Sequence, residues 1–345
     1  MARSRGRSFC RFRRMKNYLI AETYGLGDKL YTDSLVKELL SRADTGKVAM
    51  LVSKAGGSLR MPFYGGRVEL LPMEFAWNRR RAQRNPLRLL RSILAPRAAF
   101  GTRFSGYVGL CPRGDLWQRL ILRLIGAAPI ISYGYSRGEG FLERILGRSR
   151  EPVMEARISF ARQIAPDILP KPGFLRDPSA PARRGEVFLA PEASDPKREL
   201  EESKWIQISR ELRKNGWKTV LVVHANTAVS RENFGEFSEV ADLPVPDLIR
   251  RAQGVGFAVA VDSFMGHLLA ACGAGVVSIF GPQRPDVWAP AAERRRVVYK
   301  NFPCSPCGKE LSECPLCRSG KNCIQSVSAE DVVAAFYDLA GGERP

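Results

Sequence analysis

The chain has 345 residues, 45% of them hydrophobic, which is enough for two domains with full cores and argues against a disordered protein. No stretch of about 20 residues is free of charge, and no apolar core follows the basic N-terminus, so we expect a cytoplasmic protein without a signal peptide or membrane span. The formal net charge of +19 indicates an anionic substrate, surface or partner.

This positive charge belongs to the first half of the chain. Residues 1–180 carry 33 Lys/Arg and 14 Asp/Glu, whereas residues 181–345 carry 21 of each. Residues 3–16 hold seven basic residues and residues 75–114 hold nine arginines, and neither block contains an acid. Such blocks favour a membrane surface, a phosphorylated glycan or nucleic acid, although a solvated tail and a solvated helix face are the alternative.

Short apolar runs alternate with helical patterns, which predicts strand–helix–strand units and parallel sheets. The first strand leads through a Gly-rich turn into a helix within residues 18–42. This turn is not a dinucleotide fingerprint, because Leu30 stands where the third glycine is needed. The strands expected in the first half lie near residues 18–22, 48–52, 68–71, 107–110 and 129–133.

Within the second basic block, apolar residues recur at helical spacing with arginines between them. The apolar residues are Leu87, Leu90, Ile93 and Leu94, and the arginines are Arg84, Arg88 and Arg91. The pattern is typical of an amphipathic helix at a membrane interface, and also of a surface helix packed on its own domain.

A Pro- and Gly-dense segment at residues 165–185 separates two halves of similar design. The second half is predicted to contain strands at 187–190, 219–224, 257–261 and 276–280, and helices at 200–214, 247–253, 266–272 and 329–339. We therefore predict a basic tail over residues 1–16, an N-terminal lobe over 17–164, a linker over 165–185 and a C-terminal lobe over 186–345, with a cleft between the lobes.

The apolar segment 256–290 contains Asp262 and His267, one of two histidines in the chain. A buried strand ends at Asp262, and SFMGH leads into a helix, so unpaired N–H groups and a positive dipole end are expected there. In this interpretation Ser263 caps the helix and donates to a phosphate, Asp262 accepts from sugar hydroxyls, and His267 steadies either the diphosphate or Asp262. The alternative is a capping aspartate and a satisfied core histidine.

The string Asp-Ser, then His, Leu-Leu-Ala-Ala-Cys-Gly, Phe-Gly-Pro-Gln and Trp-Ala-Pro resembles the donor-binding signature of glycosyltransferase family 9, the ADP-heptose heptosyltransferases. The sequence departs from that signature at Phe264, Met265 and Gly266, while the loop length is kept. The resemblance implies a donor site at Asp262, Ser263, Phe264, Gly266 and His267. It also implies an α/β fold of GT-B type, with two Rossmann-like lobes whose parallel sheets face across a cleft.

The turn Gly25-Leu26-Gly27-Asp28 resembles the family's opening turn, in which an aspartate is the general base. By that match Asp28 takes the proton from the acceptor hydroxyl, a role that suits a fixed carboxylate. A helix-capping role for Asp28 is the alternative and is compatible with catalysis.

Two weaker resemblances lie in the second half. FLAPEASDPKRELEESKW resembles a family loop that holds the diphosphate, which implies Ser194 and either Lys197 or Lys204. VLVVHANTAVSRENF resembles the segment around the base and ribose, which implies Glu232. Each of these is otherwise an ordinary surface residue.

Five cysteines fall within residues 304–323, at positions 304, 307, 314, 317 and 323. Two Cys-x-x-Cys pairs in a cytoplasmic chain suggest a soft metal more than disulfides, and free thiols are the alternative. By the family resemblance we favour Cys304, Cys307, Cys314 and Cys323 as ligands of structural zinc or iron, with Cys317 as the rival. We expect no metal to be required for catalysis.

These observations predict an inverting glycosyltransferase that moves heptose or a related sugar from an ADP-sugar to an anionic glycolipid of the lipopolysaccharide core. Its expected place is the cytoplasmic face of the inner membrane, with peripheral membrane contact. A protein O-heptosyltransferase with a Cys-bound metal is the second hypothesis. A basic nucleic-acid-binding module is the third, and few aromatic residues interleave the basic blocks to support it.

Overall fold

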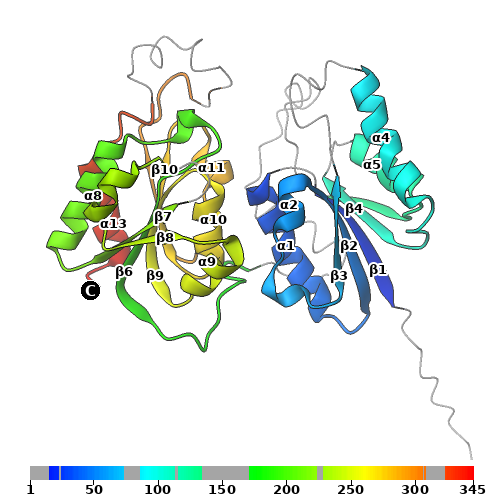
Figure 1. The fold of residues 1–345 in the computed structure, drawn as a ribbon, viewed down its shortest axis with the longest axis horizontal. Helices are drawn as coiled ribbons and strands as arrows, with labels where there is room; N and C mark the ends of the chain where they lie inside the picture. The colour runs from blue at the N-terminus through cyan, green and yellow to red at the C-terminus, as the bar shows by residue number, and fades with distance from the viewer. Residues whose placement is uncertain are drawn as a thin grey trace, which may run out of the picture.

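The computed structural model describes residues 15–22, 25–73, 86–112, 116–133, 171–223, 228–305, 307 and 323–345. Its two lobes stand side by side, each built on one parallel sheet covered by helices (Figure 1). In the described part of the chain, no helix combines the length and the apolar character needed to cross a bilayer.

The N-terminal lobe contains a five-stranded sheet in the order β3-β2-β1-β4-β5, and all four strand pairs are parallel. Each of the five strands predicted for this half is confirmed. The strands are β1 (Lys16–Glu22), β2 (Thr45–Ser53), β3 (Val68–Met73), β4 (Val108–Pro112) and β5 (Ile130–Tyr133); the helices are α1 (Leu26–Ser41), α2 (Lys54–Ser58), α4 (Pro86–Phe100) and α5 (Leu116–Leu124), with a 3-10 turn η1 (Pro62–Tyr64).

The C-terminal lobe contains a six-stranded parallel sheet in the order β11-β10-β9-β6-β7-β8. The predicted strands and helices are present, and the structure adds the edge strands β8 and β11, whose charged residues hide them from the apolar pattern. The strands are β6 (Arg183–Ala190), β7 (Lys218–Val223), β8 (Glu239–Asp242), β9 (Val255–Val261), β10 (Gly275–Phe280) and β11 (Arg295–Tyr299). The helices are α8 (Glu202–Lys214), α9 (Val245–Arg251), α10 (Phe264–Ala271), α11 (Pro285–Trp288) and α13 (Ala329–Ala340), with 3-10 turns η3 (Pro196–Arg198) and η4 (Arg231–Glu236).

Alternation along β9 assigns its two faces to two cores. Phe257, Val259 and Val261 pack in the core that includes α8 and α13, whereas Ala258 and Ala260 face α10. The small alanines let α10 lie close to the sheet, since a Cβ built on Gly266 would come within 3.1 Å of the Ala260 Cβ. Burial on both faces explains why this strand reads as a continuous apolar run.

The two lobes contact each other through α1 and α10, which face one another in the middle of the molecule (Figure 1). The Tyr31 hydroxyl of α1 lies 2.7 Å from Nδ1 of His267 on α10. A second link runs from Lys37 Nζ to the Phe174 carbonyl oxygen, at 2.5 Å. The amino ends of both helices therefore belong to one region between the lobes.

Candidate functional site

The C-terminal sheet reverses its winding direction between β6 and β9, which are adjacent and parallel. Loops that leave the carboxyl ends of such a strand pair diverge to opposite sides and leave room for a ligand. Ser194 lies on the loop after β6, and Asp262 follows β9 directly. Two of the predicted donor-site residues thus flank the position where an open α/β sheet binds its ligand.

Arg198, which the sequence interpretation did not single out, joins these two loops. Its Nη1 donates to the Asp262 backbone oxygen at 2.9 Å and lies 3.4 Å from Oδ2, while Nη2 donates to Ser194 Oγ at 2.7 Å. A guanidinium can do this because its N–H groups form a rigid planar fork. The available sequence signal was a second cation directly after Lys197, at the end of the loop that follows β6.

Burial dominates the electrostatics of Asp262 and His267. It raises the pKa of the Asp262 carboxyl, and the Arg198 charge only partly offsets this rise. Burial, together with Arg198, lowers the pKa of His267 to about 4. The His267 side chain is therefore neutral near pH 7, a form that carries no charge and can donate one hydrogen bond.

Three further predicted residues lie at the start of α10. Ser263 is the N-cap residue, but its side chain makes no capping bond, and its buried Oγ has no hydrogen-bond partner among the described residues. Phe264 is half-buried against the core between the lobes. Gly266 contributes close packing of α10 on β9. The helix thus presents an amino end and one spare hydroxyl, which together suit a phosphate group.

The structure distinguishes the two candidate lysines. Lys197 lies on η3 beside Arg198, where its ammonium group is 3.6 Å from Asp195. Lys204 lies on α8 and donates instead to the Gln325 carbonyl oxygen, which ties α8 to the segment before α13. Lys197 is therefore the better placed of the two for a diphosphate. Glu232 is exposed in η4.

Asp28 lies in the first turn of α1 and is buried. It forms the return half of a capping box, in which the Gly25 N–H donates to its Oδ2 at 3.3 Å. A Cβ on the neighbouring Gly27 would lie 3.5 Å from Cδ2 of His267. The capping alternative is thus realised, and it holds the Asp28 carboxyl at the end of α1 that lies near His267.

Three of the predicted cysteine ligands lie in the described residues: Cys304 is exposed, Cys307 is half-buried and Cys323 is buried. Burial raises the pKa of the Cys323 thiol, and the nearby Cys304 and Cys307 thiols raise it further. Within the described ranges, no group of three or more His, Cys, Asp or Glu side chains is arranged to hold a metal ion. Because Cys314 and Cys317 lie outside those ranges, the metal site stays a prediction.

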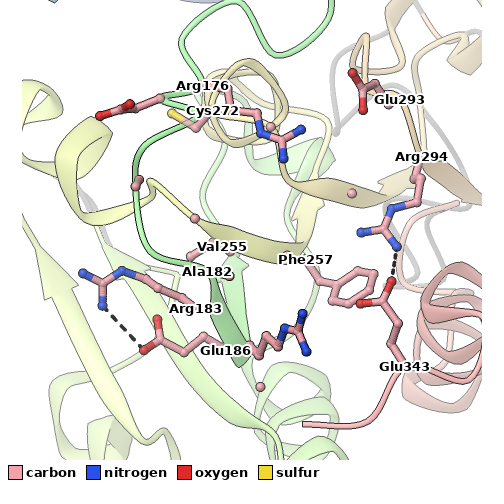
Figure 2. Close-up of a pocket in the computed structure, with 18 of the residues that line it drawn as sticks. Arg176, Ala182, Arg183, Glu186, Val255, Phe257, Cys272, Glu293, Arg294 and Glu343 are labelled. Carbon is pink, nitrogen blue, oxygen red and sulfur yellow. Dashed lines mark hydrogen bonds and ion pairs between the residues drawn. The ribbon is translucent and has the colours of Figure 1, made fainter.

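A cavity of ≈ 610 Å³ opens at the opposite end of the same sheet, near the amino ends of β6, β9 and β10 (Figure 2). Two ion pairs lie in its walls, Arg183 with Glu186 and Arg294 with Glu343. Ligands of parallel α/β sheets bind outside the carboxyl ends, so this cavity is separate from the candidate site.

A family model matches the part of the chain that contains the candidate site. Residues 157–317 match the model of glycosyltransferase family 9 (heptosyltransferase), a range that includes β6 to β11 and every predicted donor-site residue. The chain carries a glycosyltransferase family 9 domain. The predicted family and enzyme class are thereby confirmed.

Among proteins similar to this chain is lipopolysaccharide heptosyltransferase 1 of Pseudomonas aeruginosa, 30% identical over 116 residues. That alignment spans 32% of this chain and 32% of the relative, so about a third of each protein is compared.

Solved structures extend the likeness in fold to both lobes. E. coli heptosyltransferase WaaC with ADP-2-deoxy-2-fluoro heptose is 16% identical, has a TM-score of 0.65 and is covered to 99% by 93% of this chain. The iron-containing dodecameric glycosyltransferase TibC of enterotoxigenic E. coli is 14% identical, with a TM-score of 0.54, and 95% of this chain covers 78% of it. The predicted GT-B arrangement of two Rossmann-like lobes is confirmed.

Proposed function

We propose that this protein is an inverting glycosyltransferase that moves heptose or a related sugar from an ADP-sugar to an anionic acceptor of the lipopolysaccharide-core type. The observation that carries the proposal is the contact of α1 with α10. It puts the Asp28 end of one lobe beside the Asp262–His267 segment of the other, as a transfer between two bound substrates requires.

In the proposed reaction, the Asp28 carboxylate accepts the proton of the acceptor hydroxyl as that oxygen attacks the anomeric carbon. The bond from this carbon to the diphosphate breaks on the opposite face, so ADP leaves and the configuration inverts. One carboxylate suffices on the acceptor side, because the leaving group is a diphosphate that needs no proton.

In this proposal, groups at the start of α10 stabilise the negative charge that develops on the diphosphate. Free backbone N–H groups at that helix end, the Ser263 hydroxyl and the cations Lys197 and Arg198 are suited to stabilise it without a metal. Asp262 and His267 fix the sugar and the diphosphate as hydrogen-bond acceptor and donor. This assignment is supported by the spare Ser263 Oγ and by the Arg198 fork, which joins Ser194 to Asp262.

The direct test is turnover of a panel of nucleotide sugars, with release of the nucleoside diphosphate as the readout. We expect ADP-heptose to be consumed in the presence of a lipopolysaccharide-core acceptor, and UDP- or GDP-sugars to be poor donors. Thermal stabilisation by ADP-sugar alone is the companion measurement, with an oligonucleotide as the other arm. Stabilisation by the oligonucleotide and not by any nucleotide sugar would sink the proposal in favour of nucleic-acid binding.

The acceptor and location remain part of the same proposal. A lipid-linked, phosphorylated acceptor at the cytoplasmic face of the inner membrane is complementary to the basic first half of the chain. The name of the Pseudomonas aeruginosa relative supports a lipopolysaccharide acceptor.

One observation favours a second candidate, a protein O-heptosyltransferase with a cysteine-bound metal. Cys304 and Cys307 lie near Cys323, on a segment whose Cys307 N–H donates to the Pro282 carbonyl oxygen after β10. Thiolates of this kind suit zinc or iron in a structural role beside the donor lobe. Metal analysis of the purified protein, together with a peptide-acceptor assay, distinguishes the two: iron together with peptide glycosylation would favour this candidate.

A further inference from the structure

Helix α4 places three leucines on its solvent side. Leu87, Leu90 and Leu94 are 69%, 51% and 49% exposed. At 3.6 residues per turn these three positions fall within an arc of about 60°. The opposite side of the helix is the one that packs on the lobe, through Ser92, Ile93 and Pro96. Of the four apolar residues in the amphipathic pattern, Ile93 is therefore buried in the core and the three leucines face solvent.

This concentration of exposed apolar groups is local. Among the described residues seven large hydrophobic side chains are exposed, and four of them lie on α4 or on the adjacent α5, where Leu120 is the fourth. Arg97 of α4 donates to the Leu124 carbonyl oxygen of α5 at 2.6 Å, which fastens the two helices together. Both helices lie on the side of their lobe that faces away from the C-terminal lobe (Figure 1).

The charge around Leu87, Leu90 and Leu94, here called the leucine face, indicates which partner binds there. Residues 86–112 and 116–133 contain six arginines and no acidic residue or lysine. Arg91 is exposed beside the leucines on α4. Leucines that insert between headgroups, rimmed by arginines that meet lipid phosphates, are the composition of an interfacial helix on an anionic bilayer. A second copy of the chain would bring arginines against arginines.

We propose that the α4–α5 face of Leu87, Leu90, Leu94 and Leu120 is a docking surface for an anionic phospholipid membrane. This deepens the proposed function by naming the surface that brings the acceptor lobe to a lipid-linked acceptor. Docking by the leucine face leaves α1, on the other side of the N-terminal lobe, and α10 of the C-terminal lobe free of the bilayer.

The test is flotation of the full chain with vesicles of equal parts phosphatidylglycerol and phosphatidylcholine, compared with phosphatidylcholine alone. The wild type is expected to float with the anionic vesicles, and more weakly as salt is raised. The triple variant L87S/L90S/L94S should lose binding roughly tenfold or more, because the apolar area that enters the interface is removed. The matched control A95S/A99S alters exposed residues of the same helix outside the leucine arc and should bind like the wild type.

A second pair of variants tests the contribution of positive charge to vesicle binding. R91Q should weaken anionic-vesicle binding, and R295Q, at an exposed arginine of β11, should leave it unchanged. Undiminished flotation of the leucine variant would overturn the proposal. So would a wild-type dimer that the leucine variant dissociates while neither floats, since a second copy would then be the occupant. Vesicle binding needs neither donor nor acceptor, so a chain that floats but consumes no nucleotide sugar refutes only the proposed function.

A second inference rests on the contact between the lobes. A neutral imidazole carries one N–H, on either Nδ1 or Nε2. The Tyr31 hydroxyl lies 2.7 Å from Nδ1 of His267, and the two rings meet edge to face with centroids 5.1 Å apart. A phenol is protonated near neutral pH and can donate to Nδ1, which leaves the proton on Nε2. The Nε2 side of the ring is also the side near Gly27, since Cδ2 adjoins Nε2.

We infer that Tyr31 is a positioning residue that holds His267 in the Nε2–H tautomer, so that the acceptor lobe prepares the donor-lobe histidine to donate to a phosphate oxygen. Packing of Tyr31 against Val287 of α11 fixes its ring for this role. The N–H is therefore set only while α1 and α10 are in contact. This inference rests on the proposed function for the identity of the ligand, but not for the tautomer.

The chain's two histidines make the test direct. Nitrogen-15 histidine NMR of the full chain without substrate, with His267 assigned by its loss in H267Q, should show the Nε2–H form for the wild type and a shift toward Nδ1–H for Y31F. Y31F should also raise KM for the ADP-sugar about fivefold with little change in kcat, as expected for one lost hydrogen bond. The control Y107F, in the outer core of the same lobe, should change neither. An unchanged tautomer in Y31F would overturn the inference, whatever the donor turns out to be.

Discussion

Each lobe contains a buried acid with a cationic partner, Asp33 in one and Asp262 in the other, and these two pairs differ in what surrounds them. In the N-terminal lobe, Lys29 Nζ donates to both Asp33 oxygens at 3.1 and 3.0 Å, and their side chains are 2% and 0% exposed. In the C-terminal lobe, the Arg198–Asp262 pair is looser, at 3.4 Å, and the Arg198 side chain is 19% exposed.

The Lys29–Asp33 pair is closed by a third group. The Tyr64 hydroxyl lies 2.7 Å from Lys29 Nζ and donates to Asp33 Oδ1 at 2.5 Å. Burial raises the pKa of Asp33 despite these partners. Arg198 instead divides its donors between a carboxylate, a carbonyl and a hydroxyl at the edge of a loop. The Lys29–Asp33 pair is fully enclosed, whereas the Arg198–Asp262 pair lies at a sheet switch point, where open α/β sheets bind their ligands.

The largest effect is expected one residue before the enclosed pair, at Asp28. Changing Asp28 to Asn keeps an oxygen for the Gly25 N–H but removes the base, so kcat for sugar transfer should fall about 10²- to 10⁴-fold. Binding of the ADP-sugar, measured by calorimetry, and the unfolding free energy should stay near wild type. Full transfer activity in D28N would assign the base elsewhere.

Breaking the enclosed pair should cost stability. K29M leaves Asp33 charged and uncompensated, and we expect a loss of about 3–5 kcal/mol in the free energy of unfolding in guanidinium chloride. The double variant K29M/D33L, which removes both charges, should recover most of this loss. If K29M alone unfolds like the wild type, the pair has no structural role and the contrast between the lobes fails.

The fall in unfolding free energy at acid pH tests whether His267 is buried in its neutral form. Its folded pKa of about 4 lies below the ordinary value of 6.5, so its contribution is fully present above pH 6.5 and is lost as pH falls toward 4. We expect this to remove about 3 kcal/mol of unfolding free energy across that window. Asp33 and Asp262 have raised pKa values and act with the opposite sign, so the measurement is the difference between wild type and H267Q. An equal fall at acid pH in both would show that His267 is not buried neutral.

Removing Arg198 should weaken donor binding while leaving the fold intact. R198A is expected to raise Kd for the ADP-sugar about tenfold to a hundredfold, and R198K should fall in between, since an ammonium lacks the planar fork. Because Arg198 lowers the Asp262 pKa, donor affinity in R198A should also decline at a higher pH than in the wild type. R210A, at an exposed arginine paired with Glu236, is the matched control. Calorimetry across pH measures both effects.

The smallest effect is expected from a pair of serines at helix starts. Ser328 caps α13 and accepts from the Asp331 N–H, so S328A should cost about 1 kcal/mol of stability and leave the donor Kd unchanged. Ser263 makes no such bond, so S263A should spare stability and raise the donor Kd about fivefold. The reverse result would make Ser263 an ordinary cap.

Much of this architecture could be predicted from the sequence. The lengths of the apolar runs and their alternation with helical patterns predicted nine strands, namely the five of the N-terminal lobe and β6, β7, β9 and β10 of the C-terminal lobe. The Asp262–His267 spacing predicted a donor loop after β9. The edge strands β8 and β11 were missed, since three of the five β11 residues are exposed and the strand lacks an apolar run. Lys197 and Lys204 could not be separated, because only the η3 turn and the α8 register decide which lysine lies beside Arg198.

The sequence by itself determined that two parallel sheets form and that an aspartate ends the strand before α10, because strand and helix periods are local properties of the chain. Only the tertiary structure decided that Arg198 spans two loops, that Tyr31 of one lobe reaches His267 of the other, and that Leu87, Leu90 and Leu94 face solvent while Ile93 is buried. These features depend on which surfaces meet after folding, and a helical repeat does not specify which of its faces will be covered.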